Sequence, residues 1–108
     1  MNLKHIKNKN YDYYEDAQGR WQGEYKDYYS NGQLMRYCYH KDSKKHGEYK
    51  WYYDDGTLGI HCWYKNGKKH GEYKWYDKDG SLWKHTYYEN GKDKEHYLKI
   101  KKIENLLS

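Results

Sequence analysis

The chain repeats itself every 24 residues. The tetrapeptide Gly-Glu-Tyr-Lys begins at residues 23, 47 and 71. A fixed period of this length is typical of stacked supersecondary units, each of which buries apolar surface only against its neighbours. Because such arrays usually present binding surfaces, the repeat says more about architecture than about biochemistry, and it does not identify a partner.

Turn residues recur at alternating intervals of 13 and 11 residues, which predicts two strands in each unit. Asn-Gly and Asp-Gly pairs favour type I′ hairpin turns, in which both central residues have positive φ. The predicted turn glycines are Gly32, Gly56, Gly67, Gly80 and Gly91. Between the turns, side chains alternate with the period of a strand, as in residues 48–53. We therefore expect an all-β fold, an elongated single-sheet antiparallel meander of β-hairpins with about eight strands, over residues 11–16, 24–30, 34–40, 48–54, 58–64, 72–77, 82–88 and 95–99.

Three segments follow from this pattern: a basic N-terminal tail (1–10), the repeat array (11–97) and an amphipathic C-terminal segment (98–108). In the last segment Ile100, Ile103 and Leu107 would share one face of a helix. We expect a short helix there that caps the sheet, because a bare sheet edge invites aggregation.

Aromatic residues argue for a folded chain despite a mean hydropathy of −1.63, which by itself suggests disorder. The chain has 17 Tyr and 5 Trp but no Phe, so almost every ring carries a group that tolerates water. Such rings suit a single-layer sheet whose two faces are exposed to solvent. The absence of Pro fits strands that need all their backbone donors.

The net charge of +5 is concentrated in the two tails. Residues 11–91 carry thirteen basic and thirteen acidic side chains, so the repeat body is neutral and we expect no nucleic-acid partner. No apolar run is long enough to span a bilayer, and the first residues lack the apolar core of a secretory signal. These features predict a cytoplasmic protein.

The two cysteines, Cys38 and Cys62, are one period apart. If each unit is two adjacent strands, their Cα atoms lie about 9.6 Å apart, from a strand spacing of about 4.8 Å. A disulfide needs a shorter Cα separation, so we expect two free thiols.

The pattern Asn-Gly-Lys-x-His-Gly-Glu-Tyr-Lys-x-Tyr-x-x-x-Gly-x-Leu, from Asn66 to Leu82, closely resembles the variant form of the MORN repeat (MORN_2). The resemblance covers residues 11–97 and implies elongated, twisted single sheets of hairpins without catalytic residues. Members of that family act as scaffolds, dimerisation modules or membrane-associated elements. Similar arrays occur in giant DNA viruses and in bacterial antitoxins, which implies a viral origin and a location in a host cell or virion as one reading.

Alternate turns of a meander lie on opposite long edges, so the charges can be sorted by side. One edge collects a basic set that could bind anionic lipid headgroups, acidic proteins or the acidic edge of another copy. The candidate residues are Arg20, Lys44, Lys45, Lys68, Lys69 and Lys92. The opposite edge collects Asp27, Asp54, Asp55, Asp77 and Asp79. The simpler interpretation is that these are solvated turn residues that serve solubility.

An aromatic ladder also recurs with the period: Tyr25, Tyr49 and Tyr73 form one column, and Trp51 and Trp75 form another. These rings could stack sugars or bases. Cross-strand packing within the sheet is the favoured interpretation, because a single layer needs the rings for its own cohesion. An uncovered aromatic face would instead favour a homodimer.

Neither a metal site nor catalysis is predicted. Cys38 and His40 share a strand face, but no Cys-x-x-Cys or His-Glu-x-x-His spacing is present. The Glu and Lys of the Gly-Glu-Tyr-Lys motif are copies in every unit, whereas a catalytic residue is normally unique. We therefore expect no enzyme activity and no cofactor.

The sequence is compatible with three candidate functions. The first is a non-catalytic scaffold for protein–protein interaction that also self-associates, as a homodimer. The second is an antitoxin-like or immunity-like inhibitor of a toxin. The third is a peripheral membrane adaptor that binds anionic lipid through the basic turn edge.

Overall fold

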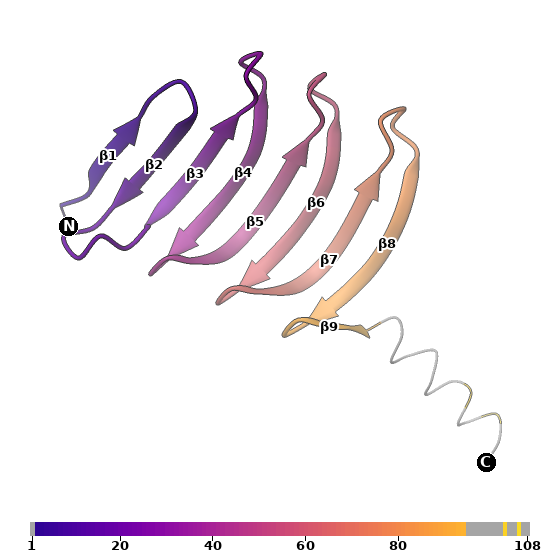
Figure 1. Ribbon diagram of the computed structural model, residues 1–108. Helices are drawn as coiled ribbons and strands as arrows, with labels where there is room; N and C mark the ends of the chain where they lie inside the picture. Colours follow the sequence, from indigo (N-terminus) through magenta and orange to yellow (C-terminus); the bar gives the residue numbers. More distant parts are fainter. Residues whose placement is uncertain (1, 95–102, 104–105, 107–108) are drawn as a thin grey trace.

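A computed structural model describes residues 2–94 together with residues 103 and 106. Among these residues the chain forms one antiparallel sheet in which every strand pairs with the next along the sequence. The sheet is a meander of hairpins, as expected (Figure 1). Its strands are β1 (Lys4–Lys7), β2 (Tyr11–Glu15), β3 (Gly23–Tyr28), β4 (Leu34–Lys41), β5 (Lys44–Tyr52), β6 (Leu58–Lys65), β7 (Lys68–Tyr76), β8 (Leu82–Glu89) and β9 (Lys92–Asp93).

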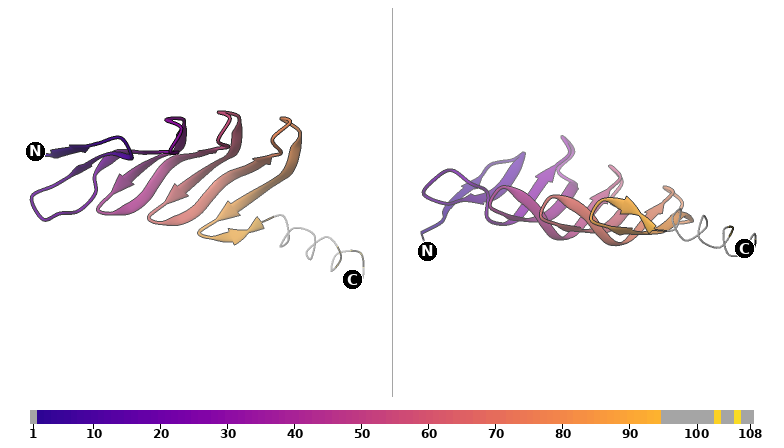
Figure 2. Two further views of the ribbon diagram at one scale, coloured as in Figure 1. Left: turned by 45° about the horizontal axis from the view of Figure 1, so that its top comes forward. Right: turned by 90° about the horizontal axis from the view of Figure 1, so that it is seen from below.

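The molecule is a twisted ribbon only one sheet thick, as the turned views of Figure 2 show. Its shortest dimension is 14 Å. Because no second layer covers either face of the described strands, each hairpin must gain its stability from the hairpins beside it. Tyr hydroxyls link successive hairpins: Tyr29 donates to the carbonyl of Tyr52 at 2.6 Å, and Tyr53 donates to that of Tyr76 at 2.8 Å.

The turns on the two long edges have different geometries. The type I′ expectation is confirmed at Asn66-Gly67 and Asn90-Gly91, where both residues have positive φ. On the other edge Gly32, Gly56 and Gly80 have positive φ but the residues before them do not, so type I′ is wrong there. Each of these glycines donates its N–H to the carbonyl three residues back, and the strand pairing shifts register beside each turn. The register shift places one additional residue on one strand of each pair, so these turns are longer than the two-residue type I′ turn.

A buried column crosses the sheet on one face, which we call the core face. Cross-strand partners share a face, and the register places Tyr25, Tyr49 and Tyr73 on odd-numbered strands beside small residues on even-numbered ones. The small partners are Cys38, Cys62 and Thr86, exposed by 3%, 1% and 5%. Large and small side chains thus alternate in one row, in which Tyr25 and Tyr73 are buried and Tyr49 is half-buried.

The two cysteines are free, as expected, and both are buried. Cys38 lies on β4 and Cys62 on β6, with Tyr49 of β5 paired between them. Burial raises the pKa of each thiol to about 11. Both side chains therefore act as small apolar groups of the core.

The first and last strands differ from the prediction. Residues 1–10 were expected to be a tail, but β1 lies within them and pairs with β2. The ring of His5 stacks on Tyr14 at 4.4 Å and bonds Asp12 at 2.6 Å, contacts that no repeat pattern indicates. β9, at the other end, pairs only with Tyr88 and Glu89. The predicted strand 95–99 lies outside the described residues, as does most of the predicted helix.

A glycine in β6 allows Trp51 to lie against the sheet. Gly59 is buried at a bulge, and a Cβ at this position would lie 2.5 Å from Cε3 of Trp51 and 3.1 Å from the Tyr53 ring. The equivalent positions of the other units hold Met35 and Trp83. This glycine is needed for space, since its φ is not in the left-handed region.

We expect Gly59→Ala to lower Tm by at least about 4 °C, because overpacking a core typically costs 1–3 kcal/mol. Thermal unfolding followed by circular dichroism measures the change. Met35→Ala is the matched control, because it places the same residue where a Cβ is already accommodated, and we expect the smaller loss. A Tm for Gly59→Ala equal to that of wild type would contradict the contact with Trp51.

The core face also contains a buried histidine. His40 is 6% exposed, and its ring meets Trp21 edge-on at 5.2 Å and Tyr25 at 5.5 Å. Burial lowers its pKa, and the charge of Lys45 lowers it further. Tyrosines stand at the equivalent positions 64 and 88.

Because the folded state holds His40 neutral, the unfolded chain takes up its proton at higher pH than the folded chain does. The stabilisation is fully present above the ordinary histidine pKa, near 6.5, and is lost as pH falls below it. Between pH 7.5 and pH 5, we expect the unfolding free energy of His40→Tyr to fall less than that of wild type. Urea titrations at the two pH values measure the difference. An unchanged slope would contradict this assignment.

Candidate interaction surfaces

One long edge of the ribbon presents a row of lysines. The turns after β4, β6 and β8 lie along this edge (Figure 1), and Lys44, Lys68 and Lys92 follow them with exposed side chains. We call these three residues the lysine edge. Successive turns are bonded together, since Gly67 donates its N–H to the carbonyl of Lys45 at 2.8 Å and Gly91 to that of Lys69 at 2.8 Å. The pitch of the row is therefore set by the backbone.

The other predicted basic-edge residues are held by neighbours. Lys45 lies over the rings of Tyr49 and Tyr64, with Nζ 5.1 Å from each centroid. Lys69 lies in the same way over Tyr73 and Tyr88, at 4.7 and 5.1 Å. These two side chains cover the core face through cation–π contacts. Arg20 is also engaged, because its Nε lies 2.8 Å from Asp16 and its Nη1 3.7 Å from Asp42.

The opposite edge is acidic, with one correction. Asp54, Asp55, Asp77 and Asp79 are exposed at its turns, and Lys78 offsets one charge through a 3.2 Å bond to Asp54. Asp27 was assigned to this edge but lies within β3, 3% exposed. Its carboxylate is bound by Arg36 across the strand pair. The sequence pattern missed this because Asp27 occupies the position that Trp51 and Trp75 hold in the other units.

The face opposite the core, which we call the charged face, carries two regular rows. One row alternates Glu with an aromatic residue, and Glu48 pairs with Trp63 and Glu72 with Tyr87. The rings of Tyr39, Trp63 and Tyr87 are 45%, 41% and 54% exposed. Sequence reasoning did not single out this trio, although its 24-residue spacing could have revealed it.

The second row of the charged face supplies partners for the glutamates. Lys26, Lys50 and Lys74 lie 3.9, 3.9 and 3.5 Å from the Glu two residues before each of them. His61 bonds Glu48 at 2.8 Å. Most of these groups are half-exposed or exposed, so each pair contributes only a few tenths of a kcal/mol, about 0.2–1. The Lys–Glu pairs of this row therefore lie along single strands, while His61 reaches Glu48 across the strand pair.

The outer edge of β8 is open over most of its length. β9 pairs only with Tyr88 and Glu89, so in the part of the chain that the structure describes residues 82–87 pair with β7 on one side and with no strand on the other. Leu82 and Trp83 are 52% and 61% exposed, and the ring of Trp83 lies 4.8 Å from that of Trp75. In the earlier units a following hairpin covers the equivalent strand, whereas among the described residues only the two-residue strand β9 follows β8.

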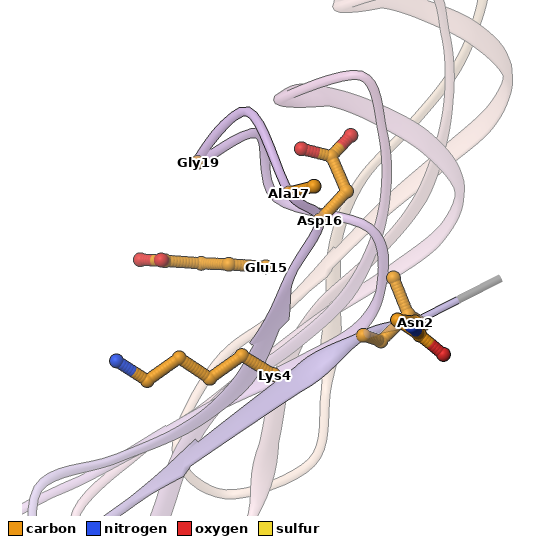
Figure 3. A pocket seen from close by; sticks show the side chains of 7 residues that line it. Asn2, Lys4, Glu15, Asp16, Ala17 and Gly19 are labelled. Atoms are coloured by element: carbon orange, nitrogen blue, oxygen red, sulfur yellow. The ribbon is translucent and has the colours of Figure 1, made fainter.

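Two hollows lie near the first hairpin. The larger one, about 510 Å³, is open and is lined by residues of β1 and of the loop after β2 (Figure 3). Lys4 and Glu15 extend side by side there, while Asp16 points elsewhere. Burial raises the pKa of Asp16, but hydrogen bonds from Gln22 and Arg20 outweigh it and hold the pKa at about 2. Asp16 is therefore a fully used loop-forming carboxylate.

The smaller hollow lies on the core face over β2, β3 and β4. It has a volume of about 330 Å³ and is lined by Tyr11, Tyr13, Trp21, Tyr25 and Arg36. Four of its five lining residues are aromatic, and the fifth is a guanidinium. It differs in this respect from the rest of the core face, where lysines cover the rings.

The described residues offer neither a metal site nor a membrane-spanning helix. Within residues 2–94, 103 and 106 no group of three or more His, Cys, Asp or Glu could hold a metal ion. The described part of the chain also contains no helix long and apolar enough to cross a bilayer. The surfaces above therefore remain the candidates for function.

The comparison with known families agrees with the geometry. Residues 21–42, 45–58 and 69–90 match the family described as MORN repeat variant, and together they make up more than half of the chain. No curated protein and no solved structure matches the chain. MORN repeats form a non-catalytic family whose members are generally scaffolds for protein or lipid interaction. Repeat period, hairpin meander and family match agree, and the chain belongs to the MORN repeat variant family.

Proposed function

We propose that this chain is a non-catalytic scaffold that binds protein and associates with itself through the open edge of β8. The single observation that carries the proposal is that, among the described residues, no strand pairs with the outer side of residues 82–87, beside exposed Leu82 and Trp83. Such an edge is a template for another strand. The apolar side chains next to it would be removed from water at the same time.

The two ends of the sheet differ in how they meet solvent. β1 has only four residues, and Lys4 and Lys7 stand at its two ends. Short, charged edge strands are a common protection against pairing. β8 has eight residues and carries its largest apolar side chains near its start. The asymmetry favours association through the β8 end.

A second copy is the partner that this edge fits. Two β8 strands can pair antiparallel about a two-fold axis, which gives a closed dimer because each copy supplies the same strand. Trp83 of each chain would then meet the opposite chain near the ends of the new strand pair. A cytoplasmic location belongs to the proposal and is supported by the two free cysteines, which are typical of reducing compartments.

Light scattering coupled to size exclusion tests this proposal. We expect wild type to show the mass of a dimer at low and high salt, and Leu82→Lys/Trp83→Lys to show that of a monomer. Charges on an edge strand prevent pairing, and the fold should tolerate both changes because Leu82 and Trp83 are more than half exposed. Tyr39→Lys is the matched control, because it removes an exposed ring from another face and should leave the dimer intact.

A monomeric wild type, or a dimer that survives the double substitution, would refute self-association through the β8 edge. If the same edge serves a toxin-masking role instead, the wild type alone is a monomer and forms a 1:1 complex with the toxin. The mass measurement separates these cases directly.

The lysine edge favours a second function, attachment to an anionic membrane surface. Lys44, Lys68 and Lys92 are exposed in one row, and the bonded turns hold their spacing. Basic side chains near an anionic surface contribute about 1 kcal/mol each, screened by salt.

Co-sedimentation with vesicles containing phosphatidylserine tests the lysine edge. We expect Lys44→Gln/Lys68→Gln/Lys92→Gln to reduce binding strongly. Lys26→Gln/Lys50→Gln/Lys74→Gln removes the same amount of charge from the charged face, and we expect this variant to retain most of the vesicle binding. Equal losses in the two variants would mean that net charge alone governs binding, and would exclude a specific edge.

A further inference from the structure

Among the departures of the first unit from the repeat, one concerns a pair of residues that face each other across β3 and β4 on the core face. Asp27 pairs with Arg36, where the second unit pairs Trp51 with Ile60 and the third pairs Trp75 with Lys84. A residue that differs between copies of one fold is not explained by the fold alone. The departure lies beneath the smaller aromatic hollow.

Asp27 holds Arg36 in one orientation. The Nε of Arg36 donates to Oδ2 of Asp27 at 3.0 Å, and its Nη2 donates to the same oxygen at 2.6 Å. The hydroxyl of Tyr25 donates to Oδ2 at 3.2 Å. The side chain of Asp27 is 5% exposed, whereas that of Arg36 is 45% exposed. The carboxylate is thus fully used inside the protein, while the guanidinium still faces solvent.

The Nη1 of Arg36 donates no hydrogen bond to any residue that the structure describes. Guanidinium groups bind carboxylates through two parallel N–H donors, and a fixed guanidinium loses little entropy when it does so. Because buried Asp27 fixes the guanidinium of Arg36 on one side and its other side faces solvent, Arg36 is preorganised to bind an anion.

The walls of the hollow are aromatic. The ring of Trp21 stacks on Tyr25 at 5.2 Å and lies 5.0 Å from Tyr13, so the wall is rigid. Tyr11 is 46% exposed at the rim. Packed rings of this kind bind planar apolar groups by stacking. The volume of about 330 Å³ is within the range of small-molecule sites.

We propose that this hollow binds a small aromatic acid, with its carboxylate on Arg36 and its ring against Trp21 and the tyrosines. The charge argues against a cationic ligand, because the guanidinium would repel it. A neutral ring would leave the Arg36 donors without a partner. This site is independent of the β8 edge and of the lysine edge.

Ligand-observed NMR with phenylacetate tests the site, and phenylacetamide and cyclohexylacetate are matched probes. We expect phenylacetate to bind, and both analogues to bind at least roughly tenfold more weakly, because one lacks the charge and the other the aromatic ring. Equal binding of phenylacetamide would overturn the role of Arg36. No binding of phenylacetate would overturn the proposal.

The repeat supplies a conservative variant. Asp27→Trp/Met35→Gly/Arg36→Ile installs the Trp, Gly and Ile that the second unit holds at these positions, which avoids leaving Asp27 buried without a partner. We expect it to lose phenylacetate binding by roughly tenfold or more, with the circular dichroism spectrum retained. Unchanged binding would overturn the proposal.

Tyr11→Ala provides a second test that leaves the Asp27–Arg36 pair in place. Because Tyr11 is at the rim and 46% exposed, the fold should tolerate its loss. We expect weaker binding of phenylacetate and a smaller difference between phenylacetate and cyclohexylacetate. Wild-type affinity and selectivity in this variant would overturn the placement of the ring in the hollow.

Discussion

The whole structure depends on one constraint, which is that a single sheet has no second layer to bury its apolar surface. Cohesion must then come from side chains on neighbouring strands of the same sheet. The core face meets this constraint by alternating Tyr with Cys or Thr across the strands, so that each large ring has room beside a small residue. Lys45 and Lys69 complete the packing by lying over pairs of tyrosine rings.

The same constraint makes the ends of the array different from its middle. An internal hairpin has its strands covered on both sides, whereas the last full strand has a neighbour on one side only in the described chain. Exposed Leu82 and Trp83 are the consequence. At the other end, β1 shields β2 and adds contacts of its own through His5. Function in such an array is expected where a unit is incomplete or where it departs from the repeat.

Most of the fold could be predicted because period and turn chemistry are local signals. Gly67 and Gly91 follow an Asn, and both pairs form the expected two-residue turns. The strand β1 could not be predicted, because Lys4–Lys7 has neither the aromatic alternation nor the turn glycine of the units. Its pairing depends on contacts with β2 that form only in the folded chain.

The candidate surfaces could be predicted only in part. Charge sorting placed Lys44 and Lys68 on one edge, but the same rule assigned Lys45 and Lys69 to it, although both lie over tyrosine rings. Adjacent residues in a strand point to opposite faces, and the bulges beside these turns change that alternation. Side-chain direction at a bulge is a tertiary property, so the sequence pattern could not resolve it.

By itself, the sequence determined the repeat, the all-β meander, the free cysteines and the lack of a catalytic pattern, because each follows from spacing and residue type. Only the tertiary structure decided which rings are buried, which charges are free and where the sheet stays open. Asp27 illustrates the difference. In the sequence it is one more acidic residue near a turn, whereas in the folded chain it is a buried partner that directs Arg36 toward an aromatic hollow. The burial and orientation of a side chain depend on its contacts with residues of neighbouring strands, and the strand register and the bulges determine those contacts.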